Sequence, residues 1–138
     1  MNEETKAENR RQKQTTAEPW HFRDLVVWQK SMVLAGDVHK ATATFPRAEM
    51  FGLSSQLRRA VVSVPSKIAE GCGRTTRGEM RQFFGHSRGS VYEVETQLCI
   101  AESLSYVSHK QLQSMLEQCW EIVRMLNALL QRLQGDHV

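Results

Sequence analysis

The stretch HKQLQSMLEQCWEIVRMLNALLQRL, residues 109–133, decides the fold of this chain. Apolar side chains recur in it at intervals of three and four, from Leu112 to Leu133, which is the spacing of one face of an α-helix. Ser108 and Gln111 have the spacing of a capping box at its start. The segment therefore predicts a long amphipathic helix with one apolar face that must be covered.

Three more periodic segments precede this helix, and the connections between them are short. They predict helices at residues 24–43, 48–69 and 77–104. Four such helices predict an all-α, antiparallel up-down-up-down four-helix bundle over residues 20–138. Residues 1–19 hold almost no large apolar side chains, so we expect a disordered N-terminal arm there.

The helix at 77–104 carries a heptad repeat. Thr76 and Glu79 have the spacing of a capping box at its start. The expected buried seam consists of Met80, Phe84, Ser87, Val91, Val94, Leu98 and Ala101. Gly85 and Gly89 lie in the same helix, and because glycine weakens a helix by about 1 kcal/mol, we expect a close packing contact there.

Proline and glycine punctuate the helix at 48–69. Pro46 is expected at its first turn, and Pro65 should produce a kink inside it. The segment EGCGR at 70–74 is expected to be a loop in which the glycines end the helix.

The polar side of the same helix carries Gln56, Ser63 and Glu70, which we expect to be structural polar residues. They form either a hydrogen-bonded seam against another helix or a polar wall. Arg59 cannot reach Glu70, since the two lie about 16 Å apart along the helix axis. We therefore expect Glu70 to bond backbone amides or an arginine of another helix.

The helix at 24–43 has two apolar stripes where a surface helix needs one. The first consists of Leu25, Trp28, Met32 and Ala35, and the second of Val27, Leu34, Val38 and Ala41. Two stripes indicate that the helix is covered on two sides. We expect the second cover to be another subunit.

Positive charge is concentrated in the middle of the chain. The net charge is +3, but residues 47–88 carry eight basic and three acidic side chains, and seven of the eight basic ones are arginine. A charge run usually means a solvated helix face, whereas arginine binds phosphate bidentately. The sequence leaves both interpretations open, a solvated face or a surface for nucleic acid phosphate.

Three arginines, Arg77, Arg81 and Arg88, fall within about 40° of one another on a helix. The full set of expected nucleic-acid-binding residues is Arg58, Arg59, Lys67, Arg74, Arg77, Arg81 and Arg88. No reading-helix motif and no set of stacking aromatic residues accompanies them. We therefore expect electrostatic binding of RNA or DNA with low sequence specificity.

Nothing in the chain has the spacing of a catalytic or metal site. Cys72, Cys99 and Cys119 form no C-x-x-C pair and are expected to be buried small hydrophobes. We expect no catalytic residues, no metal, no cofactor and no enzymatic activity. No apolar run is long enough to span a membrane and the N-terminus lacks a signal-peptide core, so we expect a cytoplasmic protein without a membrane partner.

Four ordered blocks of sequence resemble a known family. They are FRDLVVWQK at 22–30, GLSSQLRRA at 52–60, SVP with IAEGCGR within 63–74, and GS at 89–90 followed by Glu93, Glu95, Gln97 and Leu98. Over about residues 20–104 the chain resembles the bacterial four-helix-bundle proteins of the 23S rRNA intervening-sequence family. One departure is Lys67, where the family typically has asparagine.

The resemblance implies a four-helix bundle that assembles as a ring-like homopentamer. Distant relatives include the accessory variability protein of diversity-generating retroelements, which partners a reverse transcriptase and its RNA. We expect a non-enzymatic, homo-oligomeric nucleic-acid-binding protein in which repetition of one weak site raises avidity. The alternative is a protein-interaction accessory subunit, such as a partner of a retroelement reverse transcriptase.

Overall fold

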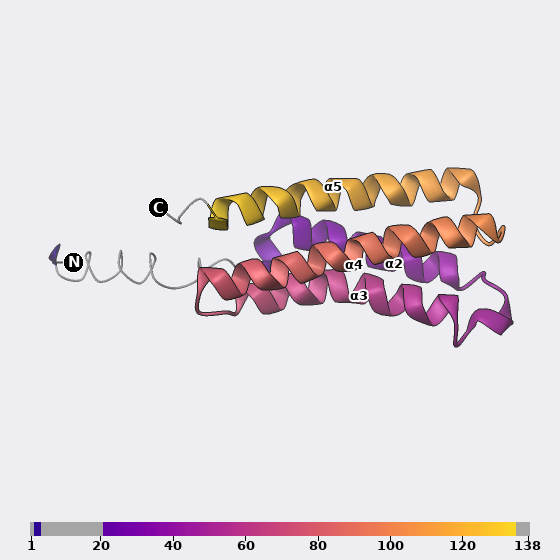
Figure 1. Cartoon of the computed structure of the whole chain (residues 1–138), viewed down its shortest axis with the longest axis horizontal. Helices are drawn as coiled ribbons and strands as arrows, with labels where there is room; N and C mark the ends of the chain where they lie inside the picture. Colours follow the sequence, from indigo (N-terminus) through magenta and orange to yellow (C-terminus); the bar gives the residue numbers. More distant parts are fainter. Residues whose placement is uncertain (1, 4–20, 135–138) are drawn as a thin grey trace.

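The computed structural model describes residues 2–3 and 21–134, and four long helices dominate it (Figure 1). In chain order the elements are η1 Phe22–Asp24, α2 Val26–Thr42, η2 Arg47–Glu49, α3 Leu53–Cys72, α4 Arg77–Ser103 and α5 His109–Gln134. No strand occurs in the described residues, and the predicted all-α four-helix bundle is confirmed. The arm expected at 1–19 lies almost entirely outside them.

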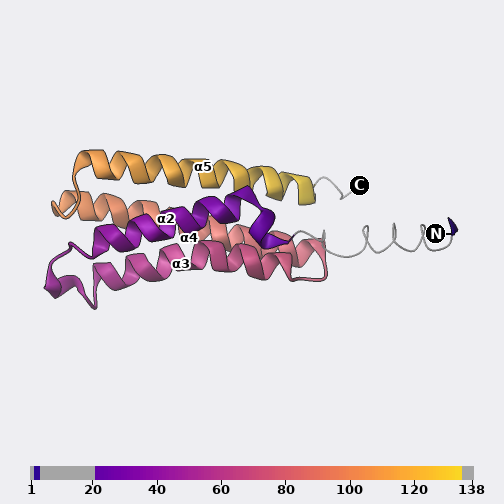
Figure 2. The same ribbon diagram turned by 180° about the vertical axis from the view of Figure 1, so that it is seen from behind.

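Successive helices run antiparallel, as the up-down-up-down prediction requires. Two opposite views place α3 and α5 in the outer layers, with α2 and α4 between them (Figures 1 and 2). Each helix packs on the next in the chain, and α5 closes the ring by packing on α2. One end of the bundle holds the α3–α4 turn and the end of α5, and the opposite end holds η2 and the α4–α5 turn.

The core is formed by the seams that the periodicity predicts. Every residue of the expected α4 seam, from Met80 to Ala101, is fully buried. The α5 stripe is buried at Leu112, Met115, Leu116, Cys119, Ile122, Leu126 and Leu133, and partly buried at Val123, Leu129 and Leu130. The interior is therefore a single apolar core that all four helices share.

The predicted starts of α4 and α5 are confirmed by their capping side chains. The Thr76 hydroxyl accepts a hydrogen bond from the Glu79 N–H at 3.1 Å. Ser108 and Gln111 bond reciprocally, since the serine hydroxyl accepts from the Gln111 N–H at 3.1 Å and the Gln111 amide oxygen accepts from the Ser108 N–H at 2.8 Å. These bonds satisfy backbone donors that a helix start leaves unpaired.

Helix α2 buries the stripe that contains Val27, Leu34 and Val38. Of the other stripe, Leu25, Trp28 and Ala35 are partly buried against the same core. Met32 is the member that stays 46% exposed. A single chain therefore covers much of both stripes, and the double stripe is weaker support for a second subunit than the sequence alone indicates.

The start of α3 differs from the prediction, because the helix begins at Leu53 and not near Ala48. Residues Arg47–Glu49 form a short 3₁₀ turn instead. The Glu49 carboxylate accepts a hydrogen bond from the Leu53 N–H at 2.9 Å, so it caps α3 from outside the helix. Gly52, with φ −112° and ψ −116°, separates the two elements.

The loop predicted at 70–74 is wrong in its first half. Helix α3 continues to Cys72 and ends at Gly73. Gly71 is buried inside the helix, and a Cβ added there would lie 3.0 Å from Cε1 of Phe84. Gly71 is therefore needed for close packing of α3 on α4, and only Gly73 stands at the helix end.

The packing contact predicted at Gly85 and Gly89 is also wrong for the single chain. A Cβ added to either residue would meet nothing within 4 Å. Both glycines lie on the outer side of α4, well away from its buried seam. The outer surface of α4 is therefore open at these two points.

Candidate nucleic-acid interface

Three of the expected basic residues share the side of α4 that faces α5. Arg88 donates a hydrogen bond from Nη1 to the Asn127 side-chain oxygen of α5 at 2.8 Å. Arg77 and Arg81 lie within about 40° of Arg88 around α4, and all three arginines are half-buried. Their stems can lie along the helix pair while the guanidinium groups stay at the surface. We call this surface the α4/α5 face; it consists of Arg77, Arg81, Arg88 and Asn127.

Lys67 and Arg74 lie on the other side of α4. The Arg74 guanidinium stacks 4.2 Å from the centre of the Phe83 ring, and the Lys67 ammonium lies 5.6 Å from it. Phe83 is on the α3 side of α4, since it shares a heptad position with Ser90, which bonds to α3. These two cations therefore form a separate cluster around Phe83.

Arg58 and Arg59 lie toward the opposite end of the bundle. Arg58 Nε donates to the hydroxyl of the buried Thr42 at 2.8 Å, so its side chain faces α2. Arg59 is exposed. Along α3, Arg58 lies about 21 Å from Cys72, where the helix ends two residues before Arg74. The structure thus divides the seven predicted basic residues among at least three surfaces.

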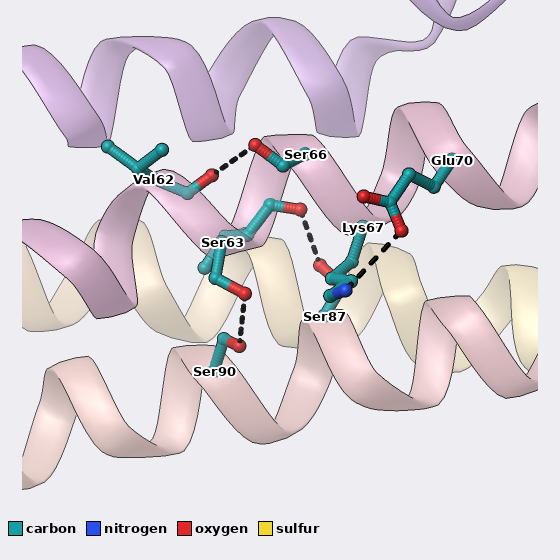
Figure 3. Close-up of polar contacts among 8 residues, drawn as sticks. Val62, Ser63, Ser66, Lys67, Glu70, Ser87 and Ser90 are labelled. Carbon is teal, nitrogen blue, oxygen red and sulfur yellow. Dashed lines mark hydrogen bonds and ion pairs between the residues drawn. The ribbon is translucent and has the colours of Figure 1, made fainter.

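Serine hydroxyls line the contact between α3 and α4, where Pro65 removes a backbone donor from α3. The fully buried Ser87 donates to the Val64 carbonyl at 2.9 Å, and Ser90 donates to the Ser63 hydroxyl at 3.1 Å (Figure 3). Helix α3 continues through Pro65 as one element. Ser63 therefore belongs to a hydrogen-bonded seam between α3 and α4, which is one of the two arrangements predicted from the sequence; the other is a polar wall.

Glu70 lies outside that seam. Its carboxylate is 3.3 Å from the Lys67 ammonium one turn earlier on the same helix, and its side chain is 47% exposed (Figure 3). The expected partner on another helix is therefore wrong for this chain. Gln56 is also exposed, so of the three polar residues only Ser63 is positioned between helices.

Two aromatic side chains accompany the arginines, although the sequence led us to expect no stacking set. Tyr92 on α4 and Trp120 on α5 are each 48% exposed. Tyr92 follows Arg88 by one helical turn, and Trp120 stands outside the apolar stripe of α5. The position of Trp120 outside the apolar stripe is the one feature of these two aromatic residues that the sequence indicates. The alignment of α4 against α5, which brings the two together, cannot be read from spacing.

The cysteines are less uniform than predicted. Cys119 is buried, Cys72 is half-buried, and Cys99 is exposed, so the expectation for Cys99 is wrong. Burial raises the pKa of the Cys119 thiol to about 12, with the nearby Glu95 carboxylate adding to the effect, and burial raises the pKa of Cys72 to about 11. Both thiols therefore stay protonated near neutral pH and are poor nucleophiles.

No group of three or more histidine, cysteine or acidic side chains suited to a metal ion occurs in the described part of the chain. Within residues 2–3 and 21–134, no helix is long and apolar enough to cross a membrane.

Four antiparallel amphipathic helices around one core, with arginines along the outer α4/α5 boundary, define a small helical-bundle protein with a basic face. Residues 23–128 match the family described as 23S rRNA-intervening sequence protein. The chain belongs to that family, which confirms the resemblance carried by the four sequence blocks.

A solved structure supports the same fold. It is the crystal structure of a protein with unknown function from the S23 ribosomal protein family of Bacteroides thetaiotaomicron VPI-5482. The TM-score is 0.69 at 21% sequence identity, over 76% of this chain and 98% of that one. At this identity the similarity shows the fold alone. No curated protein matches the chain.

Proposed function

We propose that this chain is a non-enzymatic, oligomeric protein that binds RNA or DNA electrostatically and with low sequence specificity. One observation carries the proposal, namely that Arg77, Arg81 and Arg88 lie on one side of α4 at the boundary with α5. Guanidinium groups fork onto phosphate oxygens, and a row of them along a helix follows a nucleic acid backbone. The name of the family, which refers to an intervening sequence of 23S rRNA, agrees with such a role.

A titration with fluorescent nucleic acid tests the proposal. Affinity should fall steeply with salt, with a log–log slope of about −0.9 per phosphate neutralised on duplex DNA and about −0.7 on single strands. The variant Arg81→Gln with Arg88→Gln should bind more weakly and with a shallower slope, because two phosphate contacts are lost.

The chain offers a control with the same change in net charge. Lys40 and Lys110 are both exposed and line a groove between α2 and α5 near the opposite end of the bundle. Lys40→Gln with Lys110→Gln should bind nearly as the unchanged protein does. If both double variants lose affinity equally, total charge governs binding and the α4/α5 face is not the site. If the unchanged protein does not bind at low salt, the proposed function is wrong.

Self-association, with a homopentamer as the expected form, is part of the proposal. Exposed apolar side chains support it: Met32 is 46% and Val33 60% exposed on α2, and Val62 on α3 is 47% exposed. Repetition of one basic face would raise the avidity for a long nucleic acid. Light scattering measures the mass directly, and a monomer at micromolar concentration would contradict this part.

The second candidate is a protein-interaction accessory subunit, for instance a partner of a retroelement reverse transcriptase. Phe51 is 93% exposed and Met50 is 50% exposed at the η2 end of the bundle, which favours contact with another protein. If Phe51→Ala abolishes binding of a protein partner while nucleic acid affinity is negligible, this second function replaces the first.

A further inference from the structure

Tyr92 and Trp120 lie at nearly the same level of the bundle. The Arg88–Asn127 hydrogen bond fixes how α4 and α5 are aligned. From Arg88, Tyr92 is four residues further along α4, a rise of about 6 Å. From Asn127, Trp120 is seven residues back along the antiparallel α5, a rise of about 10 Å in the same direction. The two aromatic residues are therefore offset by only about 5 Å along the bundle.

Both rings also point outward on the same surface. Tyr92 lies about 120° around α4 from the centre of the buried seam and about 40° from Arg88. Trp120 lies about 110° around α5 from its buried stripe and about 20° from Asn127. Because Arg88 and Asn127 touch, both aromatic residues border the α4/α5 face, and each leaves 48% of its surface in solvent.

Positive charge lies to one side of this aromatic pair. Arg81 and Arg88 precede Tyr92 on α4, and the exposed Arg124 follows Trp120 by one turn on α5. Beyond the aromatic pair, Glu95 continues the arginine row of α4, so the basic part of the face ends there. The phosphates of a ligand could bind these arginines on one side of Tyr92 and Trp120, whereas the two rings themselves are uncharged.

The outer surface of α4 on the side of Tyr92 has no side chain at Gly85, so the helix backbone is accessible there. Gly85 precedes Tyr92 by one heptad and so occupies nearly the same angle around the helix. A Cβ added at Gly85 would meet nothing within 4 Å. An extended ligand can therefore approach the helix backbone closely while its cyclic groups reach the aromatic pair.

We propose that the α4/α5 face binds single-stranded nucleic acid in preference to duplex, with bases stacked on Tyr92 and Trp120 and phosphates on Arg81, Arg88 and Arg124. This inference rests on the proposed function and specifies its ligand. Single strands expose the flat faces of their bases, whereas a duplex hides them in its own stack. Stacking on aromatic side chains and a basic track for the backbone are the two elements that single-strand binding requires.

The test compares a single-stranded oligonucleotide of about 12 nucleotides, as DNA and as RNA, with its duplex by fluorescence anisotropy. Trp120→Ala and Tyr92→Ala should each weaken single-strand binding by about 5- to 150-fold, because one stacked base contributes about 1–3 kcal/mol. Duplex affinity and the salt slope should stay unchanged. Phe51→Ala is the control, since it removes a more exposed aromatic ring at the other end of the bundle.

A conservative variant separates stacking from a structural role. Trp120→Phe keeps an aromatic ring and should retain most of the single-strand affinity. Stacking of bases quenches tryptophan fluorescence, so quenching on binding should be largely lost in Trp120→Phe although that variant still binds.

The failures can be told apart. If both alanine variants bind single strands as tightly as the unchanged protein, while Arg81→Gln with Arg88→Gln is impaired, stacking is wrong and the proposed function stands. Equal affinity for single strands and duplex also overturns the inference. If Trp120→Ala disperses the assembly in light scattering, the face contacts another copy and the inference fails. No binding of any nucleic acid at low salt refutes the proposed function itself.

Discussion

Replacing Gly71 by alanine should destabilise the bundle even though alanine is the better helix former. A Cβ at position 71 would lie 3.0 Å from Cε1 of Phe84 and 3.1 Å from Cβ of Phe83. The Phe83 Cβ is held by the α4 backbone and Phe84 is fully buried, so neither atom can yield without moving α3 away from α4. Overpacking of this kind costs about 1–3 kcal/mol.

Helix propensity opposes that cost with about 1 kcal/mol in favour of alanine. The expected net effect of Gly71→Ala therefore lies between no change and a loss of about 2 kcal/mol, which is about 1–3 kcal/mol below the propensity gain alone. In a chain of this size each kcal/mol corresponds to roughly 3–6 °C in Tm. Gly85→Ala is the matched control, since its added Cβ meets nothing within 4 Å and only the propensity gain remains.

Thermal unfolding followed by circular dichroism at one protein concentration gives both shifts. Gly85→Ala should melt a few degrees higher than the unchanged protein, and Gly71→Ala should melt several degrees lower than Gly85→Ala. If Gly71→Ala is as stable as Gly85→Ala, the added Cβ at position 71 has no cost and the α3–α4 contact is looser than the distances state. If Gly85→Ala melts lower, that side of α4 is covered in the assembled protein and the reasoning about open space is wrong.

Three further substitutions test single side chains. Burial raises the pKa of the Glu95 carboxyl, so the folded state binds this proton more tightly than the unfolded state does. The stability of the fold therefore decreases as pH rises from the unfolded pKa to the raised folded pKa, and the full cost of the charge is present above it. Glu95→Gln should raise Tm near pH 7, with the difference vanishing below about pH 4. Glu70→Gln should change the free energy of unfolding by less than about 0.5 kcal/mol in a urea titration, because its exposed pair with Lys67 is weak; a larger loss would reveal another partner. Ser105 has φ +64°, so Ser105→Gly should stabilise the α4–α5 turn by up to about 1 kcal/mol, and a lower Tm would contradict this.

The buried seams could be predicted because periodicity is a local property of a helix. Residues such as Met80 and Leu98 recur at a spacing that fixes their angle around α4, and both are fully buried. The caps at Thr76 and Ser108 are equally local, since each bond spans three residues. These features need no knowledge of which helix lies beside which.

The ends of α3 could not be predicted in the same way. Its start depends on a bond between the Glu49 carboxylate and the Leu53 N–H, with a non-helical Gly52 between them. Near its end, Gly71 is of the residue type that often ends a helix, but here it lies inside α3 and allows close packing against Phe84. In both places a contact outside the periodic pattern decides the structure.

The division of the basic residues has a different cause. A helical wheel gives the angle of each side chain from the core, but it does not state which neighbour lies to the left or the right. That choice depends on the handedness of the bundle. The bonds of Arg88 to Asn127 and of Arg58 to Thr42, with the stacking of Arg74 on Phe83, assign the three surfaces.

The open glycines of α4 connect the stability of the fold to the proposed ligand. A helix-interior glycine costs about 1 kcal/mol relative to alanine, and nothing in the chain requires glycine at position 85, since a Cβ added there would meet nothing within 4 Å. If a bound single strand contacts the surface of α4 at Gly85, Gly85→Leu should leave folding intact. It should weaken single-strand affinity, because the leucine side chain would block the strand from the helix backbone. Gly36→Leu on α2 is the matched control, because its site is equally open but lies on another helix. Since Gly36 lies one turn from the exposed Met32 and Val33, the comparison is made at a mass that light scattering shows to be unchanged. If the two variants have equal affinity for single strands in the anisotropy titration, Gly85 does not lie in the binding site and the side-chain-free surface of α4 has no role in binding.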